Sequence, residues 1–236
     1  MKLLSRISLV LLLTATLVLP HAGASELTPH HAVYKVKISL LSGQLNTELS
    51  ATDSGYVATH QVKPTGMSRV IARGAINASS TFSAGSNGIR PVAYHAVDTI
   101  GKDPVIDITF DWSSNQARGT VGEEAVLMQL DDIVHDNVSI QYQLMHDLLN
   151  GEADSTYVLF DVDEMRVANV RNIGTRQVAT RAGNYEVIGI QHQKEGSSRT
   201  TTLWCAAELD YLPVIIEQHR KGKLKFQAKL TSYTAD

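Results

Sequence analysis

The sequence predicts a mainly β protein: one large curved antiparallel sheet, forming a spiral or partly closed barrel, with one main α-helix near residues 136–150. From His31 onward apolar and polar residues alternate over most of the chain, which is the period of a strand with one face buried. Short turns separate these runs. Antiparallel neighbours need only such turns, whereas parallel neighbours need crossovers of about a dozen residues or more.

The first three strands are predicted as a meander. Every second residue from Tyr34 to Leu40 is apolar and the residues between them are polar or charged, so one face of this strand points to the core. Strands at 44–51 and 56–63 follow through turns that contain glycine.

The rest of the chain repeats this pattern with gaps, and residues 64–74 are predicted to be irregular. No change of composition and no low-complexity linker divides the chain. The other predicted strands are 78–82, 90–100, 105–112, 116–121, 125–130, 156–162, 165–170, 174–181, 185–193, 200–206, 212–219 and 224–233.

One segment breaks the two-residue period. Asp136 or Asn137 can cap the start of a helix, and Asn150-Gly151 supplies a left-handed stop. The spacing between them predicts a helix of about four turns with an apolar stripe against the sheet. That stripe consists of Val138, Tyr142, Met145, Leu148 and Leu149.

The first residues predict export. Lys2 and Arg6 precede an apolar run at 7–19, and Ala22-Gly23-Ala24 has the small residues that signal peptidase requires. The apolar run is shorter than the roughly 20 residues that span a bilayer. We therefore expect a Sec-type signal peptide cleaved after Ala24.

This cleavage divides the chain into a signal peptide, 1–24, and one β domain, 25–236. No later stretch is apolar and long enough to span a membrane. Ser25, not a cysteine, would follow the cleavage site, so a bacterial lipoprotein's lipid has no acceptor there. The predicted location is the periplasm, with the protein not anchored by lipid.

Composition limits the possible binding partners and the possible disulfide cross-links. The full chain has 21 basic and 24 acidic residues, a formal net charge of −3. Removing the signal takes away two basic residues and leaves 19 against 24, a net charge of −5. This balance argues against polyanion partners, such as nucleic acid or lipopolysaccharide phosphates, as a property of the whole surface. Cys205 is the sole cysteine and is interpreted as a small buried hydrophobe, so stability must come from packing and backbone hydrogen bonds.

The sequence shows no local catalytic or cofactor motif. A nucleophile elbow, a P-loop and a dinucleotide fingerprint are all missing from the mature part. The histidines are scattered, with His30 and His31 adjacent, and they are expected on the surface or in turns. Asp161 and Asp163 could share a strand face and hold calcium, but a solvated turn is the simpler interpretation. No catalytic residue, cofactor or metal is therefore predicted.

Four aromatic residues are the candidate ligand-binding residues. They could line an apolar hollow inside a curved sheet, as a lipid-binding protein requires, or they could fill the core. They are Trp112, Trp204, Tyr211 and Phe226.

The order of several motifs resembles the exported bacterial family catalogued as domain of unknown function 3108. These motifs are Phe110-Asp111-Trp112 before a helix, Gly183–Val187, and Leu203–Ala206 leading into Leu209–Val214. The resemblance runs from about Tyr34 to Tyr233. It implies a fold and an exported location, and it transfers no catalytic residues because the family has no established activity.

A second resemblance covers only about Thr201–Glu217. Its strand tryptophan, acidic turn and Leu-Pro-hydrophobic strand are similar to those of periplasmic carriers of the lipoprotein-localisation type. Such carriers fold one curved sheet around an apolar cavity covered by several helices, whereas this sequence predicts one helix. Pro213 suits a strand start or edge in either case.

Two classes of function follow. The first is a non-enzymatic periplasmic protein that supports the cell envelope by binding an apolar or envelope-derived ligand such as a lipid or lipoprotein, or an envelope protein. The second is a hydrolase acting on cell-wall or polysaccharide material. Its carboxylates would come from separate strands and lie roughly 5–10 Å apart in a cleft.

Overall fold

The computed structural model describes residues 27–236 except residues 102, 153–154, 162–163 and 195–196. The predicted signal peptide, 1–24, lies outside the described residues. Among the residues that are described, no helix has the length and apolar character needed to cross a membrane.

One 15-stranded sheet contains every strand of the described chain. Its first half is a meander that runs outward from β1 in the order of the sequence, each strand antiparallel to the last. These strands are β1 His30–Ile38, β2 Leu41–Thr52, β3 Gly55–Pro64, β4 Ile76–Gly85, β5 Gly88–Asp98, β6 Ile106–Asp111, β7 Gln116–Val121 and β8 Glu124–Gln129.

The second half extends from the other side of β1, which pairs with the last strand, β15. From β15 the sheet runs back through the sequence to β9, and β9 pairs with β10 in parallel. Its strands are β9 Val134–His135, β10 Ser155–Asp161, β11 Glu164–Ala179, β12 Asn184–Lys194, β13 Arg199–Ala206, β14 Leu212–Arg220 and β15 Lys223–Ala235.

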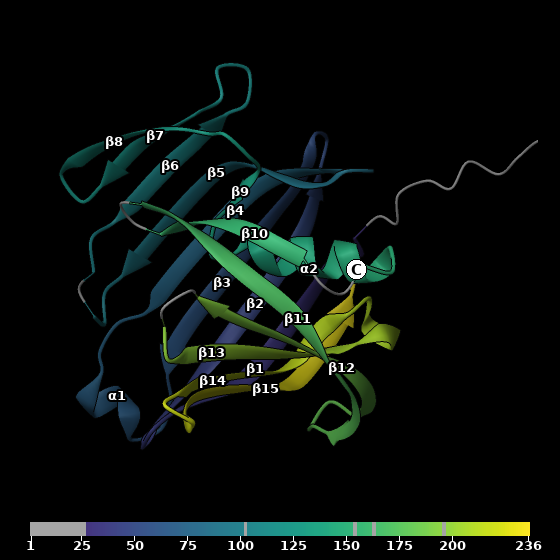
Figure 1. Cartoon of the computed structure of the whole chain (residues 1–236). Helices are drawn as coiled ribbons and strands as arrows, with labels where there is room; N and C mark the ends of the chain where they lie inside the picture. Colours follow the sequence, from purple (N-terminus) through teal and green to yellow (C-terminus); the bar gives the residue numbers. More distant parts are fainter. Residues whose placement is uncertain (1–26, 102, 153–154, 162–163, 195–196) are drawn as a thin grey trace, which may run out of the picture.

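The sheet curls so that its two halves face each other, with the helix α2, Ser139–Leu149, between them (Figure 1). Helix α2 packs against β4 and β5. Across the curl, the ring of Phe110 on β6 meets the edge of Phe160 on β10 at 6.3 Å between centroids. The sheet does not close, because β8 and β9 remain its two ends. This arrangement confirms the predicted curved antiparallel sheet with one main helix near 136–150.

Asp136 and Gly151 explain where α2 begins and ends. The Asp136 carboxylate accepts hydrogen bonds from the backbone N–H groups of Val138 and Ser139, both at 2.8 Å. These bonds satisfy donors that the first turn of a helix leaves unpaired. Gly151 adopts φ +81°, the left-handed conformation that stops a helix with little strain for glycine. The predicted capping residues are confirmed at both ends.

The predicted inward face of the first strand is confirmed only in part. Tyr34 and Val36 are fully buried, but Ile38 is 44% exposed and Leu40 is 97% exposed. Leu40 was wrongly assigned to the strand, because β1 ends at Ile38 and Ser39 turns the chain with φ +55°.

Two other predictions need correction. The strands predicted at 165–170 and 174–181 are one long strand, β11, with a bulge between Asn172 and Thr175 in its pairing with β12. The segment 64–74, predicted to be irregular, contains the short helix α1, Ser68–Ile71. A 3-10 turn, η1 at Ala207–Leu209, connects β13 to β14.

Candidate ligand-binding site

A cavity of about 330 Å³, here called the interior cavity, lies between α2 and the facing strands. Most of its walls are apolar, and the helix contributes Ile140, Gln141 and Leu144. The other lining residues are Leu45, His60, Asn137, Tyr157, Leu159, Ala168, Val170, His192, Thr201, Leu203, Ile216 and Gln218. Its volume falls within the usual range of small-molecule sites, about 300–1,000 Å³.

Two polar groups in this lining have buried atoms without a partner among the described residues. The Gln141 side chain is buried, and its Nε2 donates no hydrogen bond there. The Nε2 atom of His60 is also buried and unpaired within the described part of the chain. Buried polar atoms are normally hydrogen-bonded, so both are groups that a bound molecule could satisfy.

The interior cavity continues into a second hollow of about 730 Å³. The two share Asn137, Leu159, Ala168, His192, Thr201 and Gln218. We call the second hollow the arginine mouth, because Arg166, Arg199 and Arg220 line it. Its other lining residues are Phe160, Val167, Ser197 and Ser198.

Two of these arginines are direct cross-strand neighbours. Arg199 of β13 pairs in register with Arg220 of β14, and like charges in such a pair repel. No carboxylate of the described residues is within ion-pair distance of either guanidinium. Arg166, by contrast, forms an ion pair with Glu164. The Arg199–Arg220 pair is therefore a place where an anionic group would be stabilised.

Two strands that form the mouth, β13 and β14, share a gradient of side-chain polarity along their inner face. On β13 the inward residues run from Arg199 through Thr201 to Leu203, and their partners on β14 follow the same order. These partners are Arg220, Gln218 and Ile216. Alternate residues of a strand lie on one face. The surface thus changes from charged to polar to apolar as it enters the cavity, which matches a molecule with an anionic head and an apolar body.

A group of polar side chains with buried nitrogen or oxygen atoms, here called the polar layer, lies beside the cavity. It comprises His30, Tyr34, Thr47, His60 and Tyr142. The Tyr142 ring lies between the two histidines, at 6.2 Å from the ring centroid of His30 and 6.4 Å from that of His60. The Tyr142 hydroxyl has no hydrogen-bond partner among the described residues.

Burial keeps these histidines neutral near pH 7. It lowers the pKa of His60 to about 4, and repulsion from His30 acts in the same direction. Burial also lowers the pKa of His135 to about 4, although the nearby Asp132 opposes this shift. For His30 the pKa is lowered by burial as well. These histidines are therefore neutral polar groups, and among the residues that line the two hollows the basic ones lie at the mouth.

The two buried carboxylates serve to hold α2. Asp136 accepts a hydrogen bond from the Ser80 hydroxyl at 2.7 Å in addition to capping the helix. Asp147 accepts from Gln143 Nε2 at 2.7 Å and from the Tyr157 hydroxyl. Gln143 Oε1 in turn accepts from the backbone N–H of Ile89 at 2.7 Å. Both carboxylates are therefore committed to packing the helix against the sheet.

The two predicted tryptophans lie apart. Trp112 follows β6, where its Nε1 donates to the carbonyl of Pro91 at 2.5 Å. Trp204 lies on β13, and its Nε1 donates to Glu217 at 3.2 Å. The guanidinium carbon of Arg176 sits 3.6 Å from the Trp204 ring centroid. Trp204 also lies so close to Gly189 that a side chain there would collide with it, at 2.6 Å.

Tyr211 and Phe226 are partly buried and pack at the edges of the core. None of the four predicted aromatic residues is among those that line the interior cavity or the mouth. Their role in ligand binding therefore stays a prediction. Sequence reasoning did not select the residues that line the cavity. A signal was present for His60, because it alternates with Ala58 and Val62 on the apolar face of the same strand.

The prediction that the histidines lie on the surface was wrong for three of them. His30, His135 and His146 are all buried. Their burial has a physical reason: each lies on an inward face or on α2, and His146 Nε2 bonds the Gly85 carbonyl at 3.0 Å. Cys205, in contrast, is buried as predicted, and burial raises the pKa of its thiol.

No metal site emerges from the described part of the chain, where no three His, Cys, Asp or Glu side chains gather. The predicted alternative of a calcium pair falls partly outside the described residues. Asp163 is not among them, and the structure describes only the backbone of Asp161.

One solved structure shares this architecture. The chain superposes with a TM-score of 0.61 on a beta-barrel-like protein of domain of unknown function DUF1849 from Brucella abortus, with 11% identity, covering 90% of this chain and 99% of that one. A match to MucB has a TM-score of 0.39 and 8% identity, and covers 90% of this chain and 55% of that one.

No curated protein matches the sequence. The model of the family described as "Protein of unknown function (DUF3108)" matches residues 32–228. The first structural match supports the fold alone, and the family match confirms the resemblance found in the sequence motifs. The chain is therefore a member of the DUF3108 family.

Proposed function

We propose that this is an exported, periplasmic, non-enzymatic protein that binds an envelope-derived amphiphile. The apolar chain of the ligand enters the interior cavity, and its anionic head meets Arg199 and Arg220. The observation that carries this proposal is the shared gradient of β13 and β14, which leads from two arginines without an ion-pair partner among the described residues to apolar walls. Among the described residues the two buried carboxylates, Asp136 and Asp147, hold α2, so these two do not support the hydrolase alternative.

Filling the cavity should weaken the binding of an apolar probe. N-phenyl-1-naphthylamine is expected to fluoresce when it enters the protein, and Leu203→Trp should weaken this binding by at least about tenfold because the larger side chain occupies the cavity. Leu127→Trp is the matched control, since Leu127 is 69% exposed on β8 and should leave binding unchanged. Equal binding by both variants, at equal melting temperature, would place the probe elsewhere.

The head-group preference should depend on the mouth. A fatty acid is expected to displace the probe more effectively than an alkyl maltoside of the same chain length, because the guanidinium groups favour an anion. Arg199→Gln combined with Arg220→Gln should remove this preference and leave maltoside binding unchanged. Arg181→Gln, in an exposed turn, serves as the control. A preference that survives the double substitution contradicts the proposed role of the mouth.

A further inference from the structure

One end of the molecule exposes large apolar side chains. Leu40 lies in the β1–β2 turn, while Met67, Val70 and Ile71 lie on and beside α1, with exposures of 97%, 80%, 65% and 77%. Leu224, at the start of β15, is 49% exposed. An exposed group of this kind usually marks an interaction surface.

These segments are held side by side. Ile38, the last residue of β1, pairs with Leu41 on one side and Phe226 on the other, which joins the β1–β2 turn to the start of β15. The Ser68 hydroxyl of α1 accepts a hydrogen bond from the backbone N–H of Ser42 at 2.8 Å. The apolar side chains therefore lie on segments that are held together by strand pairing and a hydrogen bond. We call this end of the molecule, residues 37–42, 63–73 and 219–225, the basic tip.

The tip takes its name from its charge. Its three segments, 37–42, 63–73 and 219–225, contain eight basic residues and no acidic ones. Asp98, the last residue of β5, lies close to this end, because it pairs with Ile76 just beyond the second segment. The basic residues are Lys37, Lys63, Arg69, Arg73, Arg220, Lys221, Lys223 and Lys225.

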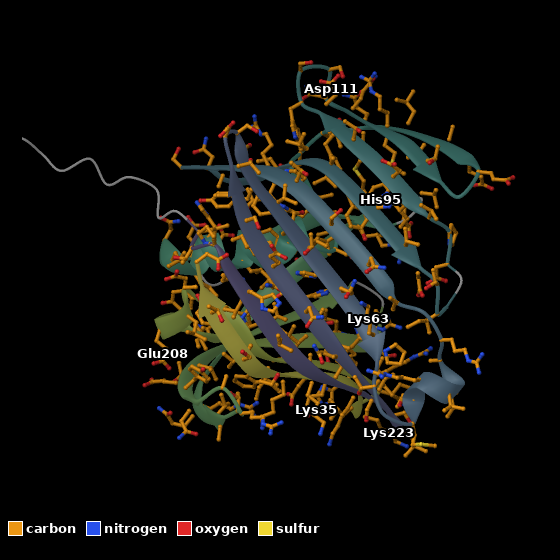
Figure 2. The ribbon with its side chains drawn as sticks, turned by 180° about the vertical axis from the view of Figure 1, so that it is seen from behind. Lys35, Lys63, His95, Asp111, Glu208 and Lys223 are labelled. Atoms are coloured by element: carbon orange, nitrogen blue, oxygen red, sulfur yellow. The ribbon has the colours of Figure 1, made fainter. Side chains whose placement is uncertain are left out.

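Acidic residues lie elsewhere on the molecule, so the tip is locally basic even though the net charge of the chain is negative. Figure 2 shows Lys63 and Lys223 toward the end with α1, and Asp111 and Glu208 away from it. Asp210 lies in the same turn as Glu208. In the field of an anionic surface, the molecule would orient with the basic tip toward that surface.

We propose that the basic tip docks on an anionic lipid bilayer. Its apolar side chains would enter the boundary between headgroups and acyl chains while the surrounding lysines and arginines contact lipid phosphates. The combination favours a bilayer over a purely polar polyanion, which would leave the apolar groups in water. Arg220 belongs both to the tip and to the arginine mouth, so docking would bring the opening of the cavity to the membrane surface. The docking itself does not depend on the proposed ligand.

Co-sedimentation with vesicles tests the proposal. The protein recovered from an exporting host should sediment with vesicles of phosphatidylcholine mixed with phosphatidylglycerol, and much less with phosphatidylcholine alone. Raising the salt concentration should release it, because screening weakens contacts with the surface charge.

Two pairs of variants separate the apolar from the electrostatic part. Ile71→Ser should weaken vesicle binding by about tenfold, since it removes a side chain that enters the lipid, whereas Leu127→Ser on β8 should change nothing. Lys223→Gln should weaken it by about fivefold, and Arg181→Gln should not. All four sites are exposed, so each variant should keep the melting temperature of the parent.

Three results would overturn the proposal. These are failure to sediment with either kind of vesicle, sedimentation that is indifferent to Ile71→Ser, or a dimer in solution that Ile71→Ser dissociates, which would assign the tip to a second copy of the chain. None of them bears on probe binding in the cavity, so this proposal and the proposed function can fail separately.

Discussion

Tyr142→Ala is expected to lower the free energy of unfolding by about 3–5 kcal/mol, while Tyr142→Phe should change it by less than about 1 kcal/mol. The Tyr142 ring is fully buried and packs 5.3 Å from the ring centroid of Phe82. Truncation to alanine leaves a large cavity in the centre of the curl. The hydroxyl, however, has no partner among the described residues, so its removal breaks no bond there.

Urea denaturation followed by circular dichroism measures both variants. A loss of more than about 2 kcal/mol in Tyr142→Phe would mean that the hydroxyl is hydrogen-bonded in solution, for example by a buried water, and that the polar layer is hydrated. The comparison therefore tests whether the polar layer holds unpaired groups.

The second large effect is a loss of stability in mild acid. His60 and His135 have pKa values lowered to about 4 by burial, from 6.5 in the unfolded chain. Between these values the unfolded state binds protons that the folded state does not, so the free energy of unfolding falls as pH decreases. Each histidine should contribute a loss of roughly 2 kcal/mol between pH 7 and pH 5.

Urea denaturation at several pH values checks this prediction. His60→Gln should remove the contribution of His60, about 2 kcal/mol, from the pH-dependent loss. His31→Gln, at an exposed position next to the buried His30, should leave the loss intact. Asp136 acts in the opposite direction, because burial raises the pKa of its carboxyl. Comparison with the histidine variants therefore isolates the contribution of His60. A slope unchanged by His60→Gln contradicts the prediction.

Much of the fold could be predicted from local patterns. The alternation of Tyr34 and Val36 with polar residues identified a strand and its inner face, and the capping signals of Asp136 and Gly151 delimited the helix. Such signals lie within a few residues of the structure they determine. The prediction failed at two places. The bulge in β11 depends on its pairing with β12, which a local pattern does not show, and Leu40 leaves the strand because Ser39 turns the chain.

The candidate site could not be predicted in the same way. Arg199 and Arg220 belong to two predicted strands, but only their register shows that the two charges are adjacent. Gln141 and His60 reach the same cavity from a helix and a strand that are distant in the sequence. The aromatic residues were selected for their chemical type, whereas the cavity is defined by which inward faces meet when the sheet curls.

The pairing of β1 with β15 governs the order in which the chain can fold. Strands β1 to β8 each pair with their neighbours in the sequence, so this half can form before the rest of the chain has been synthesised. Its β1 edge, however, must wait for the last strand to be delivered, and until then it offers unpaired backbone groups to any other extended chain. Synthesis that stops before residue 223 would therefore leave a half-sheet with an unpaired β1 edge, and we expect such fragments to aggregate.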